Sequence, residues 1–313
     1  MSVGAGPSGP AEAPGAAGPG AEGGRRATLR DWVAAARPRT LPAAVVPVAV
    51  GVAVAHAAGR VVWWRALLAL LVSLAIQVGT NYSNDYSDGI RGTDEARVGP
   101  TRLVASGLAA PARVRLAAFA AFGLAALLGL AVALATSPWL LLVGAASIAS
   151  GWLYTGGPRP YGYAGLGEAF VFVFFGLVAV VGTTYVASGE LPALGYVAAV
   201  PVGLVAVALL VVNNLRDIPT DRRSGKRTLA VMLGERATRR LYAGTVGLGV
   251  LCTAAAALWR PWALLGLAAA LPAARPVRRV LGGADGRDLV PVLGMTGAAQ
   301  IVLGALLTVG IAL

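Results

Sequence analysis

Long apolar stretches recur along this chain and are separated by shorter polar segments. Nine of these stretches approach about 20 residues, the length that an α-helix needs to cross the hydrocarbon core of a bilayer. They are rich in Ala, Leu, Val and Gly, which suits close packing between membrane helices. The pattern predicts an all-α, polytopic membrane bundle of about nine transmembrane helices, at residues 41–58, 65–84, 112–135, 138–155, 166–187, 193–214, 240–258, 261–274 and 289–312.

Composition supports a membrane protein, because 57% of the residues are hydrophobic and only 13% are charged, against about a quarter in soluble domains. A net charge of +12 raises the question of nucleic-acid binding, which the placement of the charges answers. With nine spans, all Lys and Arg fall on one side except Arg60, Arg65 and Arg260. The positive-inside rule then puts the N-terminus in the cytoplasm, in the cell membrane, and no nucleic-acid partner is expected.

The N-terminal segment divides at residue 24 into a Gly, Ala and Pro-rich part and a membrane domain at residues 25–313. Residues 1–24 hold too little apolar surface to fold and predict a disordered tail. Thr28 and Asp31 offer a helix N-cap and a first-turn acid, which predicts a short interfacial helix that ends at Pro38. The sole cysteine, Cys252, excludes a disulfide framework.

Two polar segments, residues 84–107 and 213–234, begin where apolar spans stop and lie on the side predicted to be cytoplasmic. Each starts with Asn-x-x-x-Asp: Asn84 with Asp88, and Asn213 with Asp217, which repeat after 129 residues. Two interpretations remain open. Either an internal duplication places the two clusters opposite each other, or two helices ended in similar polar residues by chance.

On a helix, residues four apart share a face, so Asn84 with Asp88 and Asp217 with Asp221 each present two oxygen-bearing side chains together. Mg²⁺ prefers such oxygen ligands and is usually bound by one or two carboxylates together with substrate phosphates. Facing acidic pairs would repel one another without such partners. The two clusters therefore predict a magnesium-dependent reaction of a diphosphate.

Basic side chains interleaved with these acids fit the same interpretation. Arg91 and Arg102 in the first segment, and Lys226 and Arg227 in the second, are placed to meet phosphate oxygens. The alternative for each is a contact with solvent or lipid headgroups. A carboxylate at the start of an apolar span, Glu168, is expected to face a cavity or a basic partner.

The segments NDYSDGIRGTDE and NNLRDIPTDRRSGKRTLA resemble the two aspartate-rich motifs of the UbiA superfamily of intramembrane prenyltransferases. Residues 36–48, 99–107, 154–176 and 225–234 are similar to the branch of that superfamily that prenylates 1,4-dihydroxy-2-naphthoate in menaquinone biosynthesis. The resemblance implies a helical bundle around a central cavity. It also implies metal-binding roles for Asn84, Asp88, Asp94, Asp217 and Asp221, and catalytic roles for Asp88, Asp217, Lys226 and Arg227. Other branches carry an acid where Gly92 stands here, and Asp94 is its replacement in this interpretation.

In that branch, a polyprenyl diphosphate alkylates the naphthoate with loss of carbon dioxide and diphosphate, giving demethylmenaquinone. The resemblance implies substrate-binding roles for Arg39, Arg91, Arg102, Tyr154 and Arg159, and a membrane lipid environment. Two alternatives remain: a related prenyltransferase with another aromatic acceptor, and a secondary transporter. A transporter predicts charges near the bilayer midplane, whereas the acids here cluster at one end.

Overall fold

The structure is a computed structural model, and it describes residues 1, 26–93 and 102–313. All regular elements in these ranges are helical. The longer helices are α2 (Pro42–Ala57), α3 (Trp63–Ile90), α4 (Pro111–Ala135), α5 (Trp139–Leu153), α7 (Ala179–Ser188), α8 (Ala193–Arg223), α9 (Leu229–Cys252), α10 (Ala270–Leu281) and α11 (Leu289–Ala312). The short ones are α1 (Leu29–Ala35), η1 (Pro38–Thr40), η2 (Tyr161–Ala164), α6 (Gly167–Val171), η3 (Phe172–Val178), η4 (Thr253–Leu258), η5 (Pro261–Ala269) and η6 (Gly286–Asp288).

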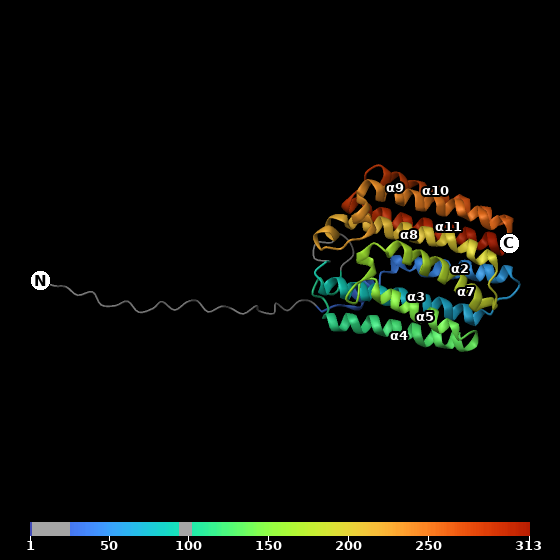
Figure 1. The fold of residues 1–313 in the computed structure, drawn as a ribbon, viewed down its shortest axis with the longest axis horizontal. Coiled ribbons are helices and arrows are strands. Elements are labelled where there is room, and N and C mark those ends of the chain that lie inside the picture. The colour runs from blue at the N-terminus through green and yellow to red at the C-terminus, as the bar shows by residue number, and fades with distance from the viewer. Residues whose placement is uncertain (2–25, 94–101) are drawn as a thin grey trace.

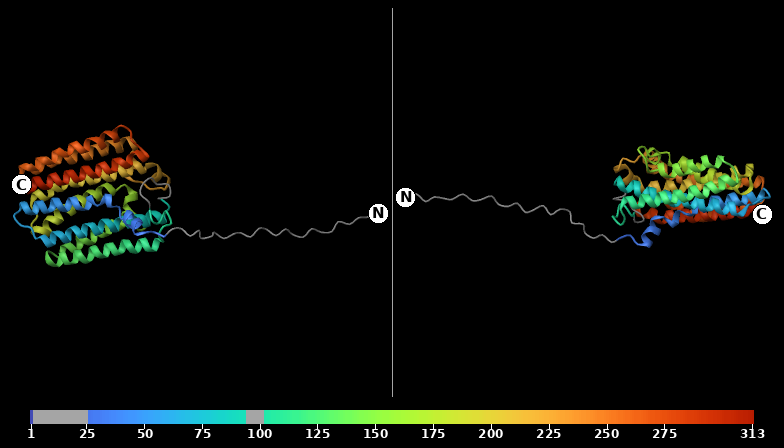
Figure 2. Two further views of the ribbon diagram at one scale, coloured as in Figure 1. Left: turned by 180° about the vertical axis from the view of Figure 1, so that it is seen from behind. Right: turned by 90° about the horizontal axis from the view of Figure 1, so that it is seen from below.

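The long helices run nearly parallel and form a bundle, from α9 and α10 at one edge to α5 and α4 at the other (Figures 1 and 2). Six helical segments in the described ranges are long and apolar enough to cross a membrane, and a seventh arises if the bent pair Leu29–Thr40 and Pro42–Ala57 is one span. The predicted all-α polytopic bundle is confirmed. Helix α5 is shorter than these segments, and α10 carries three arginines, so the count of nine spans stays a prediction. The central cavity also stays a prediction.

Close helix contacts depend on glycine, as the composition suggested. A Cβ on Gly304 of α11 would lie 2.4 Å from Val46 Cγ1 of α2, and one on Gly51 of α2 would lie 2.6 Å from the Val180 carbonyl oxygen of α7. Both distances are shorter than any real contact, so only glycine permits these helices to approach. Helix α2 thereby packs between α11 and α7 in the centre of the bundle.

The N-terminal helix α1 begins as the sequence predicted. The backbone N–H of Asp31 donates to Thr28 Oγ1 over 3.3 Å, and the Thr28 N–H donates to Asp31 Oδ2 over 2.8 Å, forming a capping box. Helix α1 ends before Pro38. The predicted tail, residues 1–24, lies almost wholly outside the described residues.

Two helices extend further than the hydrophobic pattern indicated. The apolar stretches end near residues 84 and 214, whereas α3 continues to Ile90 and α8 to Arg223. The added turns are polar in sequence, yet their side chains include several that are buried inside the bundle. The hydropathy pattern therefore located the end of the apolar part of each helix. Beyond that point, α3 and α8 continue and carry polar side chains.

The segment between α6 and α7 is a π-helix, η3. Such i→i+5 segments are rare and occur frequently near functional sites. Here the π-helix separates the polar start of the span, at Glu168, from helix α7, which packs on α2.

Candidate active site

Buried polar side chains concentrate at the ends of α3 and α8, which lie at the same end of the bundle (Figure 1). Helix α3 buries Asn81, Ser83, Asn84, Asp85, Ser87 and Asp88, and helix α8 buries Asn214, Arg216, Asp217 and Asp221. Because carboxylates and amides rarely face hydrocarbon without a functional reason, these two stretches define the candidate site. The opposite end carries the C-terminus (Figure 1).

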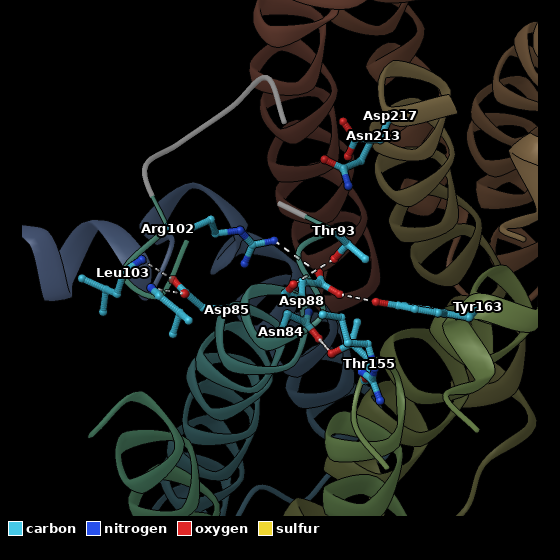
Figure 3. Close-up of polar contacts among 12 residues, drawn as sticks. Asn84, Asp85, Asp88, Thr93, Arg102, Leu103, Thr155, Tyr163, Asn213 and Asp217 are labelled. Carbon is cyan, nitrogen blue, oxygen red and sulfur yellow. Dashed lines mark hydrogen bonds and ion pairs between the residues drawn. The ribbon is translucent and has the colours of Figure 1, made fainter. Parts of the chain in front are cut away.

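Asp88 lies at the centre of the first group of contacts (Figure 3). Its Oδ1 accepts a hydrogen bond from the Tyr163 hydroxyl over 2.8 Å, and its Oδ2 lies 3.7 Å from Arg102 Nη2. Arg102 is itself buried. The structure thus brings a predicted metal ligand and a predicted phosphate-binding arginine together.

The neighbours of Asp88 on α3 hold two different loops. Asn84 Oδ1 accepts a hydrogen bond from Thr155 Oγ1 over 2.7 Å. Asp85, which is fully buried, accepts backbone hydrogen bonds from Leu103 over 2.9 Å and from Val104 over 3.0 Å (Figure 3). Asp85 therefore anchors the chain directly after Arg102. The sequence analysis did not single out Asp85, although its place between Asn84 and Asp88 was visible.

Tyr163 connects the two halves of the site. Besides its bond to Asp88, its ring lies 4.9 Å from Lys226 Nζ and 5.5 Å from Arg91 Cζ, both within the range of cation–π contacts. Its carbonyl oxygen accepts a hydrogen bond from the backbone N–H of Arg227 over 3.2 Å. Burial, followed by the nearby Asp88 carboxylate, raises the pKa of Tyr163, so its hydroxyl remains a donor. No sequence pattern marked this tyrosine.

Asp217 and Asp221 of α8 contact other side chains than those around Asp88. Arg216 donates to both oxygens of Asp217, over 2.7 and 2.8 Å, and to Asn213 Oδ1 over 2.9 Å. Thr228 Oγ1 lies 3.4 Å from Asp221 Oδ2. Arg216 is buried with Asp217 and was missed, although it directly precedes that acid in sequence.

The remaining predicted residues are distributed over the same end. Arg91 donates to the carbonyl oxygens of Thr155 and Gly157, so it supports the loop after α5. The Tyr154 ring packs against the Tyr161 ring, with ring centroids 5.5 Å apart.

Two predicted residues lie apart from these contacts, and a third cannot be placed. Arg39 and Arg159 are exposed and form no hydrogen bond or ion pair through their side chains in the described part of the chain. Arg227 contributes only its backbone to the Tyr163 contact. Asp94 lies outside the described residues.

The donor set fits Mg²⁺ better than a transition metal. The buried acidic and amide side chains on α3 and α8 offer carboxylate and amide oxygens, and the chain's one cysteine and one histidine are elsewhere in the sequence. No group of three or more His, Cys, Asp or Glu side chains with metal-binding geometry exists among the described residues. One or two carboxylates from each helix, completed by phosphate oxygens, is the usual arrangement for Mg²⁺. Asn84, Asp88, Asp217 and Asp221 would hold such ions.

The family model and the relatives that match this chain agree with one another. A family model described as UbiA prenyltransferase family matches residues 44–289. A protein of Mycobacterium tuberculosis named 1,4-dihydroxy-2-naphthoate octaprenyltransferase is 52% identical over 276 residues, covering 88% of this chain and 94% of the relative. The protein of that name from Escherichia coli is 38% identical, covering 88% and 92%.

Solved structures share the fold. A UbiA homolog from Archaeoglobus fulgidus bound to GPP and Mg²⁺ aligns with a TM-score of 0.65 at 17% identity, over 88% of this chain and 99% of that chain. The apo structure of a UbiA homolog from Aeropyrum pernix K1 aligns with a TM-score of 0.68 at 17% identity, over 85% and 97%.

Proposed function

This chain belongs to the UbiA prenyltransferase family, and from that premise we propose that it is a 1,4-dihydroxy-2-naphthoate polyprenyltransferase. It transfers a polyprenyl chain from polyprenyl diphosphate to 1,4-dihydroxy-2-naphthoate, releasing carbon dioxide and diphosphate and giving demethylmenaquinone. The observation that carries this proposal is the 52% identity, over almost the full length, with a relative named for that reaction.

The buried polar groups support the chemistry. In this proposal Asn84, Asp88 and Asp94, with Asp217 and Asp221, would hold Mg²⁺, which would supply positive charge to the diphosphate. The protein's own cations complete the environment. Arg102 lies beside Asp88, and Lys226 lies beside Tyr163, so both approach the same space from different loops.

Charge development explains why these cations matter. When the allylic carbon–oxygen bond breaks, negative charge grows on the leaving diphosphate, and fixed positive side chains stabilise that state more than the ground state. Lys226 and Arg227 have this role in the proposal. Arg39, Arg91, Arg102, Tyr154 and Arg159 bind the two substrates.

The site side of the bundle faces the cytoplasm of the cell membrane in this proposal. Helices α3, α8 and α10 end at the same end of the bundle (Figure 1). With nine spans, the N-terminal segment and the segments after the second, fourth, sixth and eighth spans lie on this side, and they carry 23 of the 26 basic residues in the sequence. The positive-inside rule then assigns that end to the cytoplasm.

The direct test is product identification. Purified protein in nanodiscs is incubated with polyprenyl diphosphate, Mg²⁺ and a panel of aromatic acceptors, and products are identified by mass spectrometry. Prenylated, decarboxylated product from 1,4-dihydroxy-2-naphthoate supports the proposal. Product from a different acceptor alone would assign another reaction of the same family.

Metal dependence is tested in the same assay. A chelator should abolish turnover and added Mg²⁺ should restore it. Asp88→Ala or Asp217→Ala should lower turnover by orders of magnitude while the protein still inserts and folds. Near-normal turnover in either variant would contradict the two-site arrangement.

A further inference from the structure

Glu168 is a buried carboxylate with an open hydrogen-bonding position. It lies at the start of α6, with 8% of its surface exposed. Its Oε1 accepts a hydrogen bond from Asn214 Nδ2 of α8 over 3.0 Å. Its Oε2 is buried and has no hydrogen-bond partner within the described part of the chain.

Burial of Oε2 without a hydrogen-bond donor costs free energy unless a ligand supplies one. A buried acceptor without a donor costs the full desolvation of that atom, and more when the group is charged. Glu168 forms no ion pair within the described residues, so no neighbouring cation offsets the cost. The open oxygen is therefore suited to a ligand that brings a hydrogen-bond donor.

The position along α8 indicates which ligand. Asn214 precedes Asp217 by three residues and Asp221 by seven, so the three side chains share one face of the helix. Because α8 runs toward the site end of the bundle (Figure 1), Asn214 lies about 4.5 Å deeper than Asp217 along the helix axis. If the diphosphate is held at the level of Asp217 and Asp221, Glu168 lies at the level of the group that the prenyl carbon must meet.

The surroundings of Glu168 suit a flat aromatic molecule. A Cβ on the adjacent Gly167 would lie 3.2 Å from Tyr154 Cε2, which places that ring close to the start of α6. From Tyr154, aromatic rings follow one another with centroid distances of 5.5 Å to Tyr161, 3.9 Å from Tyr161 to Phe170, and 6.0 Å from Phe170 to Phe174. Rings at such spacings offer π-faces and edges to another ring.

We infer that Glu168 Oε2 accepts a hydrogen bond from a ring hydroxyl of the aromatic acceptor, and that Asn214 holds the carboxylate in the orientation this needs. Glu168 is then a specificity-determining residue, which selects hydroxylated rings. This inference rests on the proposed function, because it compares the depth of Glu168 in the bundle with the position proposed for the diphosphate.

The experiment measures binding rather than chemistry, since removing a hydroxyl also changes the reactivity of the ring. Inhibition constants are determined against 1,4-dihydroxy-2-naphthoate for its two mono-hydroxy analogues, 1-hydroxy-2-naphthoate and 4-hydroxy-2-naphthoate. In the unmodified protein, one analogue should bind about 10- to 100-fold more weakly than the other, the factor expected for one hydrogen bond to a charged group.

Glu168→Gln should abolish that difference while leaving the Michaelis constant for polyprenyl diphosphate unchanged, because its amide donates where Oε2 accepted. The matched control is Glu190→Gln, an exposed acid just after α7, and it should retain the full difference. If Glu168→Gln does not fold, the double variant Glu168→Leu/Asn214→Leu replaces both partners by apolar groups of similar size, which is often tolerated, and it should also lose the difference.

Two results would overturn the inference: equal binding of both analogues by the unmodified protein, or an unchanged difference in the Glu168 variants. A failure of the proposed function would look different. The unmodified protein would then form no prenylated product from 1,4-dihydroxy-2-naphthoate in the first place.

Discussion

Asp88 illustrates how much individual side chains of this site depend on residues far away in sequence. Its hydroxyl donor, Tyr163, and its arginine neighbour, Arg102, come from two different loops. Spacing on α3 predicted that Asn84 and Asp88 share a face, which the helix confirms. The partner Tyr163 could not be predicted, because no local pattern relates a tyrosine 75 residues away to one carboxylate.

Tyr163 gives the first prediction at this scale. Tyr163→Phe removes the donor to Asp88 but keeps the ring beside Lys226, so turnover should fall by about tenfold or more, the loss of one hydrogen bond to a charged group. Tyr163→Ala also removes the ring and should additionally raise the Michaelis constant for polyprenyl diphosphate. Steady-state kinetics on both variants measures this. Identical constants for the Phe and Ala variants would show that the ring contributes nothing to Lys226.

Lys226 and Arg39 should separate kinetically if their proposed roles are right. Lys226→Ala should lower turnover with little change in the apparent Michaelis constant for the naphthoate, because its contact strengthens as the diphosphate leaves. Arg39→Ala should mainly raise that constant, at a cost of about 1.5 to 3 kcal/mol for one charge-assisted hydrogen bond. Unchanged acceptor kinetics in Arg39→Ala would remove Arg39 from the acceptor site.

Helices α3 and α8 show what the hydrophobic pattern can and cannot reveal about an element. The apolar stretches located both helices, but they ended about two turns too early, because a window of hydropathy stops at the first polar run. The continuation is stabilised by tertiary contacts, such as Arg216 with Asp217, that a single sequence does not display. Asn84 and Asp88 therefore lie on α3, and Asp217 and Asp221 on α8, rather than in loops.

Asp85 provides a prediction for the segment that follows Arg102. Asp85→Ala leaves two backbone N–H groups, those of Leu103 and Val104, without their acceptor, at about 1 to 3 kcal/mol for each buried group. The thermal unfolding temperature in nanodiscs should fall, and turnover should fall with it because Arg102 loses its support. Asp285→Ala, at an exposed acid between α10 and α11, is the control and should leave both unchanged. An Asp85→Ala variant with the same unfolding temperature and the same turnover as the unmodified protein would contradict the anchoring role.

At the scale of the whole molecule, the N-terminal helix and the C-terminus lie at opposite ends of the bundle (Figures 1 and 2). The residues just before α1 are joined to the loop between α3 and α4 by a hydrogen bond from the Ala27 N–H to the Leu108 carbonyl oxygen over 3.1 Å. The C-terminus lies at the other end of the bundle (Figure 2). Hydropathy and charge placement in the sequence predicted opposite ends for these two parts of the chain. The relative order of the helices across the bundle was not predictable, because it depends on contacts such as Gly304 with Val46.

Topology is the prediction at this scale. Reporter fusions near residues 95, 160, 225 and 283 should all report the cytoplasm. Fusions near residues 60, 137, 189, 260 and the C-terminus should report the opposite side, because a nine-span topology puts 23 of the 26 basic residues on the first side. Reversal of any one reporter would show that the number of crossings differs from nine.

The π-helix η3 has a consequence for how this span tolerates insertions and deletions. A π-turn accommodates one residue more than an α-turn, so the halves before and after it are rotated relative to a continuous α-helix. A single-residue deletion between Phe172 and Val178 would therefore be absorbed by a change from a π-turn to an α-turn, whereas a single-residue insertion would turn one half by about 100° against the other. Either Glu168 would leave Asn214, or Thr184 would leave the Gly51 carbonyl that it now contacts. This short segment therefore tolerates the loss of one residue better than the gain of one, even where its side chains are interchangeable.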